Sequence, residues 1–112
     1  MKFAEMRRIC ERMDRVLGDE RADWDQLADC ATALLIIAFR LERLADDAVW
    51  GYDGIQERLT AALETMSGAL NWVVEEGHDA PRERVIEQLQ RARRSGLTAL
   101  DMVEAPEEAA EG

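Results

Sequence analysis

The residues best suited to chemistry surround position 78, where the chain's single histidine stands among carboxylates. Glu75 and His78 have the Glu-x-x-His spacing that metal sites in helical bundles use, and Glu76 and Asp79 lie next to them. Such sites need a second Glu-x-x-His pair, which the sequence lacks, and Gly77 interrupts a helix between the two candidate ligands. We therefore expect a solvated loop histidine, with no metal and no cofactor. A metal–carboxylate enzyme would require two subunits to pool these ligands.

Two cysteines are the other reactive side chains. Cys10 and Cys30 lie equally far from the middle of a predicted helix turn, so an antiparallel hairpin would place them at the same level. That geometry permits a disulfide, but we expect two inert, buried thiols, since cysteines at core positions usually behave as small apolar residues. One histidine at a helix end offers no Cys–His pair for nucleophilic catalysis. Glycine-rich phosphate loops are also absent, so the sequence predicts no enzyme.

Helices must position these residues, because apolar side chains recur at spacings of three and four along almost the whole chain. The pattern predicts helices over about 2–17, 24–50, 54–76 and 80–103. Their connections are short, so consecutive helices should be antiparallel neighbours. We expect an all-α, antiparallel four-helix bundle formed by a single domain of residues 1–103. Residues 104–112 are acidic and contain Pro106, and we expect them to form a flexible tail.

Local signals support these boundaries. Asp23 followed by Gln26 forms a capping-box pattern before the second helix, and Asp53 with Gln56 repeats it before the third. Gly96 falls on the inward face of the fourth helix, where it would allow a close helix approach or a bend.

Residues 30–39 form the most apolar stretch, and they do not keep to one face. Most belong to the predicted core stripe, but Ile36 and Phe39 fall on or beside the polar side of their helix. Large apolar residues outside the core are typical of interfaces. The predicted interface residues are Ile36, Phe39, Trp50 and Trp72. A homodimer through residues 24–50 would cover the first two, whereas Trp24, Trp50 and Tyr52 could equally close the ends of the bundle.

The chain is strongly acidic, with 14 basic and 24 acidic side chains and a formal net charge of −10. This charge argues against binding to a nucleic-acid backbone or an anionic membrane. The predicted acidic patch comprises Asp25, Asp29, Asp46, Asp47, Asp53, Glu57 and Glu64. Such a surface most commonly keeps a protein soluble. It could also engage a partner protein with a basic surface, and spaced carboxylates can stand in for nucleic-acid phosphates.

These observations favour a non-catalytic interaction module that regulates or inhibits a protein partner. A sharper version is an inhibitor that mimics nucleic acid, of the anti-CRISPR or anti-restriction kind from a phage or mobile element. The alternative is a structural or assembly subunit that self-associates without inhibiting anything. The N-terminus has no apolar signal region, and the longest apolar run is about half of a membrane span of ~20 residues, so we expect a cytoplasmic protein.

Overall fold

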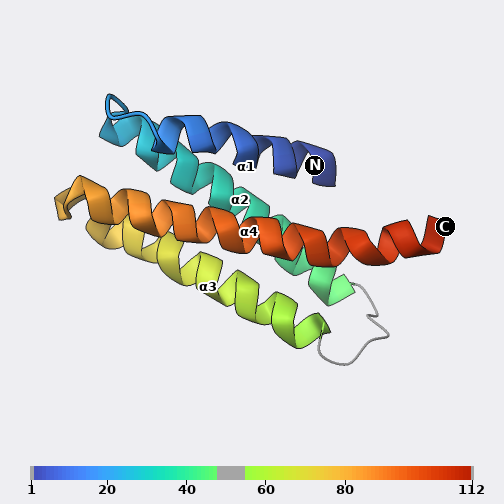
Figure 1. Ribbon diagram of the computed structural model, residues 1–112. Helices are drawn as coiled ribbons and strands as arrows, with labels where there is room; N and C mark the ends of the chain where they lie inside the picture. Colours follow the sequence, from blue (N-terminus) through green and yellow to red (C-terminus); the bar gives the residue numbers. More distant parts are fainter. Residues whose placement is uncertain (1, 48–54, 112) are drawn as a thin grey trace.

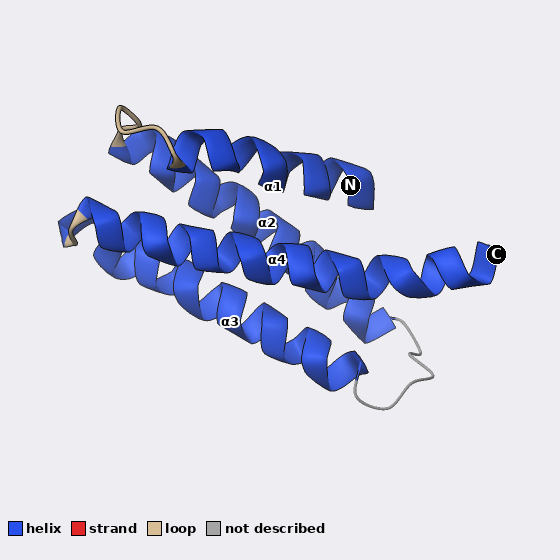
Figure 2. Cartoon of the chain, viewed as in Figure 1, coloured by secondary structure: helices blue, strands red, loops and turns tan. Residues whose placement is uncertain are grey.

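The computed structural model describes the backbone of residues 2–47 and 55–111 and the side chains of residues 2–43 and 57–103. Among these residues it contains four α-helices and no strand, which confirms the predicted all-α bundle (Figure 2). The helices are α1 (Phe3–Leu17), α2 (Trp24–Asp47), α3 (Ile55–Glu76) and α4 (Arg82–Glu111), and a 3₁₀ turn at Gly77–Asp79 precedes α4. Each helix runs back along the one before it (Figure 1).

The start of α2 follows the predicted capping box. The Gln26 backbone N–H donates to Asp23 Oδ1 at 2.9 Å, and the Asp23 N–H donates to Gln26 Oε1 at 2.9 Å. Two N–H groups that a helix end would leave unpaired are thereby satisfied. The second predicted capping box, at Asp53 and Gln56, lies outside the described side chains.

The last helix differs from its predicted range at both ends. It begins at Arg82, directly after Pro81, and its backbone continues to Glu111, past the predicted end at 103. Alanine and glutamate dominate this extension, and both are strong helix formers, so helix propensity continues beyond Val103, the last residue whose side chain is described. The side chains of the predicted tail lie outside the described residues.

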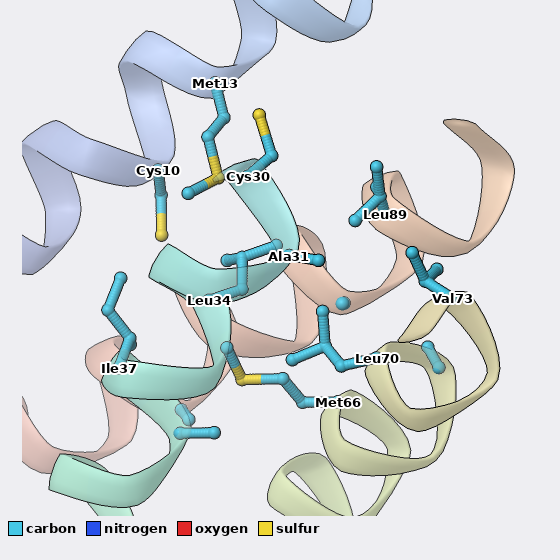
Figure 3. Close-up of a cluster of buried hydrophobic side chains, with 14 of the residues drawn as sticks. Cys10, Met13, Cys30, Ala31, Leu34, Ile37, Met66, Leu70, Val73 and Leu89 are labelled. Carbon is cyan, nitrogen blue, oxygen red and sulfur yellow. The ribbon is translucent and has the colours of Figure 1, made fainter. Parts of the chain in front are cut away.

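The core lies between α2 and α4, each of which packs against the other three helices, with α1 and α3 on opposite sides of this pair (Figure 1). The apolar stripe of every helix points into it. Leu34 and Ile37 of α2, Met66 and Leu70 of α3 and Leu89 of α4 are fully shielded from solvent (Figure 3). No polar or charged side chain is buried among the described residues. The fully buried side chains of the described core therefore pack through apolar contacts.

Two glycines let other elements approach closely. A Cβ added at Gly96 would stand 3.2 Å from Met66 Cε, so its backbone leaves room for a core methionine, as the predicted close approach requires. A Cβ at Gly77 would stand 3.0 Å from the ring of Trp24. Trp24 thus closes this end of the bundle. Its ring also contacts the His78 ring edge-on, with 5.6 Å between the ring centroids.

Candidate functional site

The middle of α2 carries two large apolar side chains that the bundle does not cover. Ile36 is 46% exposed and Phe39 is 67% exposed, whereas Leu34, Ile37 and Leu41 of the same helix are fully buried. The other three helices all pack against α2, and α4 crosses in front of it in Figure 1. Because Ile36 and Phe39 stay exposed in spite of these contacts, their side chains point away from the core. Both side chains that we predicted to form an interface are therefore accessible to a partner.

Charged and polar residues share this outward face of α2. At about 100° per residue, Asp25, Asp29, Thr32, Arg40 and Arg43 fall within a quarter turn of Ile36, and all five are exposed. We call these five residues with Ile36 and Phe39 the α2 face. Its carboxylates lie toward the start of the helix, its apolar residues in the middle and its guanidinium groups toward the end. Neither Arg40 nor Arg43 makes an ion pair with another described residue.

A shallow groove of about 270 Å³ runs between α1 and α2 beside this face. Its floor is mostly apolar and includes Ile9, Met13, Cys30 and Ala33, and Asp29 stands on its rim. Ile9 of α1 and Ala33 of α2 both line the groove and are both only partly buried. The groove extends the apolar surface of this side of the molecule.

The predicted tryptophan sites have different positions. Trp72 lies on α3, where it is half-buried and packs against the core. Its place in an interface stays a prediction. Trp50 and Tyr52 lie outside the described residues. Val74, which the sequence did not single out, is 61% exposed on α3.

The structure divides the acidic patch. Asp25 and Asp29 are exposed in the first turns of α2, at the end of the bundle where Trp24 meets Gly77. Glu57 and Glu64 are exposed toward the other end, where they line one side of α3. These four carboxylates therefore form two separate groups. The remaining predicted members, Asp46, Asp47 and Asp53, lie outside the described side chains.

The residues around His78 do not assemble a metal site within the described part of the chain, where no three His, Cys, Asp or Glu side chains are placed to hold an ion. Glu75 and Glu76 are exposed at the end of α3, and His78 is exposed in the 3₁₀ turn. The His78 Nδ1 atom lies 3.6 Å from an Asp79 carboxylate oxygen. The histidine is thus the solvated turn residue that the sequence predicted.

Both cysteines are buried free thiols, as predicted. In Figure 3 the Met13 side chain lies between Cys10 and Cys30, and their sulfur atoms point in different directions. Burial raises the pKa of both thiols above its ordinary value of 9.0, and at Cys10 the positive charges of Arg93 and Arg7 offset part of this effect. Thiols with a raised pKa carry little thiolate at neutral pH and are poor nucleophiles.

Two arginines of α4 have structural roles that the sequence did not predict. Arg82 donates hydrogen bonds from its guanidinium group to the backbone carbonyls of Ala22 and, at 2.7 Å, Asp19, in the turn between α1 and α2. Arg93 donates from Nε to the Cys10 carbonyl of α1 at 2.6 Å. The signal for Arg93 was its place between Leu89 and Leu97, each one turn away on the inward side of α4.

Comparison with known proteins returns no similarity: no family model, no curated protein and no solved structure matches the chain. The helices of the described residues contain no stretch that is both apolar and long enough to cross a lipid bilayer.

Proposed function

We propose that this chain is a non-catalytic protein-interaction module that binds its partner through the α2 face. The observation that carries the proposal is the exposure of Ile36 and Phe39 in the middle of a central helix. Full burial of such a side chain is worth about 1.5–3 kcal/mol, so a partner that covers both gains a substantial driving force. Aromatic anchors surrounded by polar groups are also typical of binding hot spots.

The charges of this face bear on what kind of partner it accepts. Asp25 and Asp29 favour a basic surface, in line with a module that regulates or inhibits a protein carrying one. Arg40 and Arg43 lie on the same face, however, so the surface is not uniformly acidic. A nucleic-acid mimic needs a continuous row of negative charge. Among the described carboxylates of the predicted patch, Asp25 and Asp29 stand apart from Glu57 and Glu64. Mixed charge therefore favours a protein partner with both signs of charge over a nucleic-acid-binding groove.

Site-specific photo-crosslinking in the native host tests this proposal. A photoreactive phenylalanine analogue replaces Phe39, and a control chain carries it at Arg91, an exposed position on α4. We expect irradiation to yield a discrete protein adduct from position 39 only, which mass spectrometry then identifies as either this chain or another protein. If position 39 gives no more adduct than position 91, the α2 face is not an interaction surface.

A further inference from the structure

We infer that the partner of the α2 face is a second copy of this chain, bound with the two α2 helices antiparallel and related by a two-fold axis. This inference rests on the proposed function and specifies its partner. In the arrangement, Arg43 of each copy faces Asp25 of the other. Arg40 of each copy faces Asp29 of the other.

The spacing of the four charges supports this arrangement. Asp25 and Arg43 are about five helical turns apart, and Asp29 and Arg40 are about three turns apart, so both pairs lie along one side of the helix. Both pairs are also centred on the same point, at the level of Leu34. A two-fold axis through that point brings each carboxylate opposite a guanidinium group. The four contacts extend over about 27 Å of helix at ~1.5 Å per residue.

The apolar residues fit the same axis. Ile36 of one copy comes to the level of Thr32 of the other, next to the axis. The Thr32 hydroxyl already donates to the Ala28 carbonyl at 3.1 Å, so covering it leaves no donor unpaired. Phe39 of one copy comes to the level of Asp29 of the other. Val74, the remaining exposed large apolar residue of the described chain, stands near this level on α3, because α3 ends where Trp24 begins α2.

Other occupants match this charge pattern less well. A parallel pair of α2 helices would place Asp25 against Asp25 and Arg43 against Arg43, which repel each other. A uniformly basic partner would leave both arginines facing like charge. An antiparallel second copy satisfies all four groups of both chains. A contact made mainly by one helix is small, so we expect a weak dimer with a micromolar dissociation constant.

Reversing the charges on one half of the face at a time tests the arrangement. The acidic variant carries Arg40→Asp and Arg43→Asp, and the basic variant carries Asp25→Arg and Asp29→Arg. All four positions are exposed, so both variants should fold, which circular dichroism checks. In each variant alone, every antiparallel contact opposes like charges. In an equimolar mixture of the two, every contact between unlike chains opposes unlike charges.

Sedimentation equilibrium over the micromolar range measures the result. We expect the wild type to dimerise, each variant alone to bind itself at least about tenfold more weakly, and the mixture to recover dimers. The control variant, Arg84→Asp with Arg91→Asp on α4, has the same net charge as the acidic variant and should dimerise like the wild type. Phe39→Ser should also weaken the dimer, because it removes the largest apolar contact without reversing charge.

Three outcomes would overturn the inference. A wild type that stays monomeric throughout the range excludes the second copy as partner. An acidic variant that dimerises like the control excludes the arginines from the contact. Variants that fail to recover dimers on mixing exclude the antiparallel pairing. The crosslinking experiment distinguishes failure of this inference from failure of the proposed function. An adduct between position 39 and a different protein would confirm the α2 face as an interaction surface and exclude only the second copy as its partner.

Discussion

Replacing Arg93 should loosen the attachment of α1 to the rest of the bundle. Its Nε donates to the Cys10 carbonyl at 2.6 Å, and its Nη1 lies 3.8 Å from an Asp14 carboxylate oxygen. The Arg93 side chain is 17% exposed and that of Asp14 is 64% exposed, so the carbonyl contact is the better shielded of the two. A hydrogen bond from a charged donor contributes about 1.5–3 kcal/mol, and a largely exposed ion pair adds about 0–1 kcal/mol.

From these values we expect Arg93→Met to lower the free energy of unfolding by about 2 kcal/mol. Methionine keeps much of the apolar stem, so most of the loss comes from the hydrogen bond. Urea denaturation followed by far-ultraviolet circular dichroism measures the change. With an m-value of about 1–3 kcal/mol/M, the midpoint should fall by roughly 1 M. Hydrogen exchange should also accelerate in α1 more than in α3.

A matched control separates this contact from a general loss of positive charge. Arg94 is the adjacent residue and is exposed, so Arg94→Met should change stability by less than about 0.5 kcal/mol. Asp14→Asn should likewise have a small effect, because it removes only the exposed ion pair. If Arg93→Met and Arg94→Met lower the free energy of unfolding equally, the Arg93 hydrogen bond does not hold α1 to the bundle.

Two further predictions concern close packing and buried thiols. Gly77→Ala should lower the free energy of unfolding by about 1–3 kcal/mol, because the new Cβ would stand 3.0 Å from the Trp24 ring. Gly68→Ala should raise it by up to about 1 kcal/mol, because no atom lies within 4 Å of the new Cβ. Urea midpoints that are equal for the two variants would contradict both predictions. Cys10 and Cys30 should react with a thiol reagent at pH 8 far more slowly in the native chain than in urea, since burial raises both thiol pKa values. The pKa of each thiol is higher in the folded chain than in the unfolded chain, so the thiols' contribution to the free energy of unfolding should be present below pH 9.0 and lost as the pH rises above it. If the free energy of unfolding instead rises above pH 9.0, the thiols are not buried as described.

The sequence predicted the elements that depend on local patterns. Apolar spacing located the helices, and the reciprocal bonds between Asp23 and Gln26 appeared where the capping box indicated. The sequence also predicted that Ile36 and Phe39 lie outside the core, because both fall on or beside the polar side of a strongly periodic helix. These predictions succeed because helix geometry fixes the direction of each side chain relative to its own axis.

Contacts that depend on the arrangement of helices were harder to predict. Trp72 projects off the core stripe of its helix, yet a large indole can reach back to the core, and the structure places it there. The roles of Arg82 and Arg93 depend on which backbone carbonyls lie opposite them, and those carbonyls are sixty or more residues distant in sequence. The spacing of the acidic and basic residues along α2 can be read from the sequence. It suggests a binding partner only once the structure shows that no other helix covers the α2 face.

Heteronuclear NMR at high and low protein concentration tests whether the α2 face binds a second copy. Amide chemical shifts are compared between concentrated and dilute samples of the wild type. We predict that the shifts which change with concentration cluster on the α2 face, around Thr32, Ile36 and Phe39, while those of Arg84 and Arg91 on α4 stay constant. Shifts that do not change with concentration, or that change on another surface, would contradict the claim.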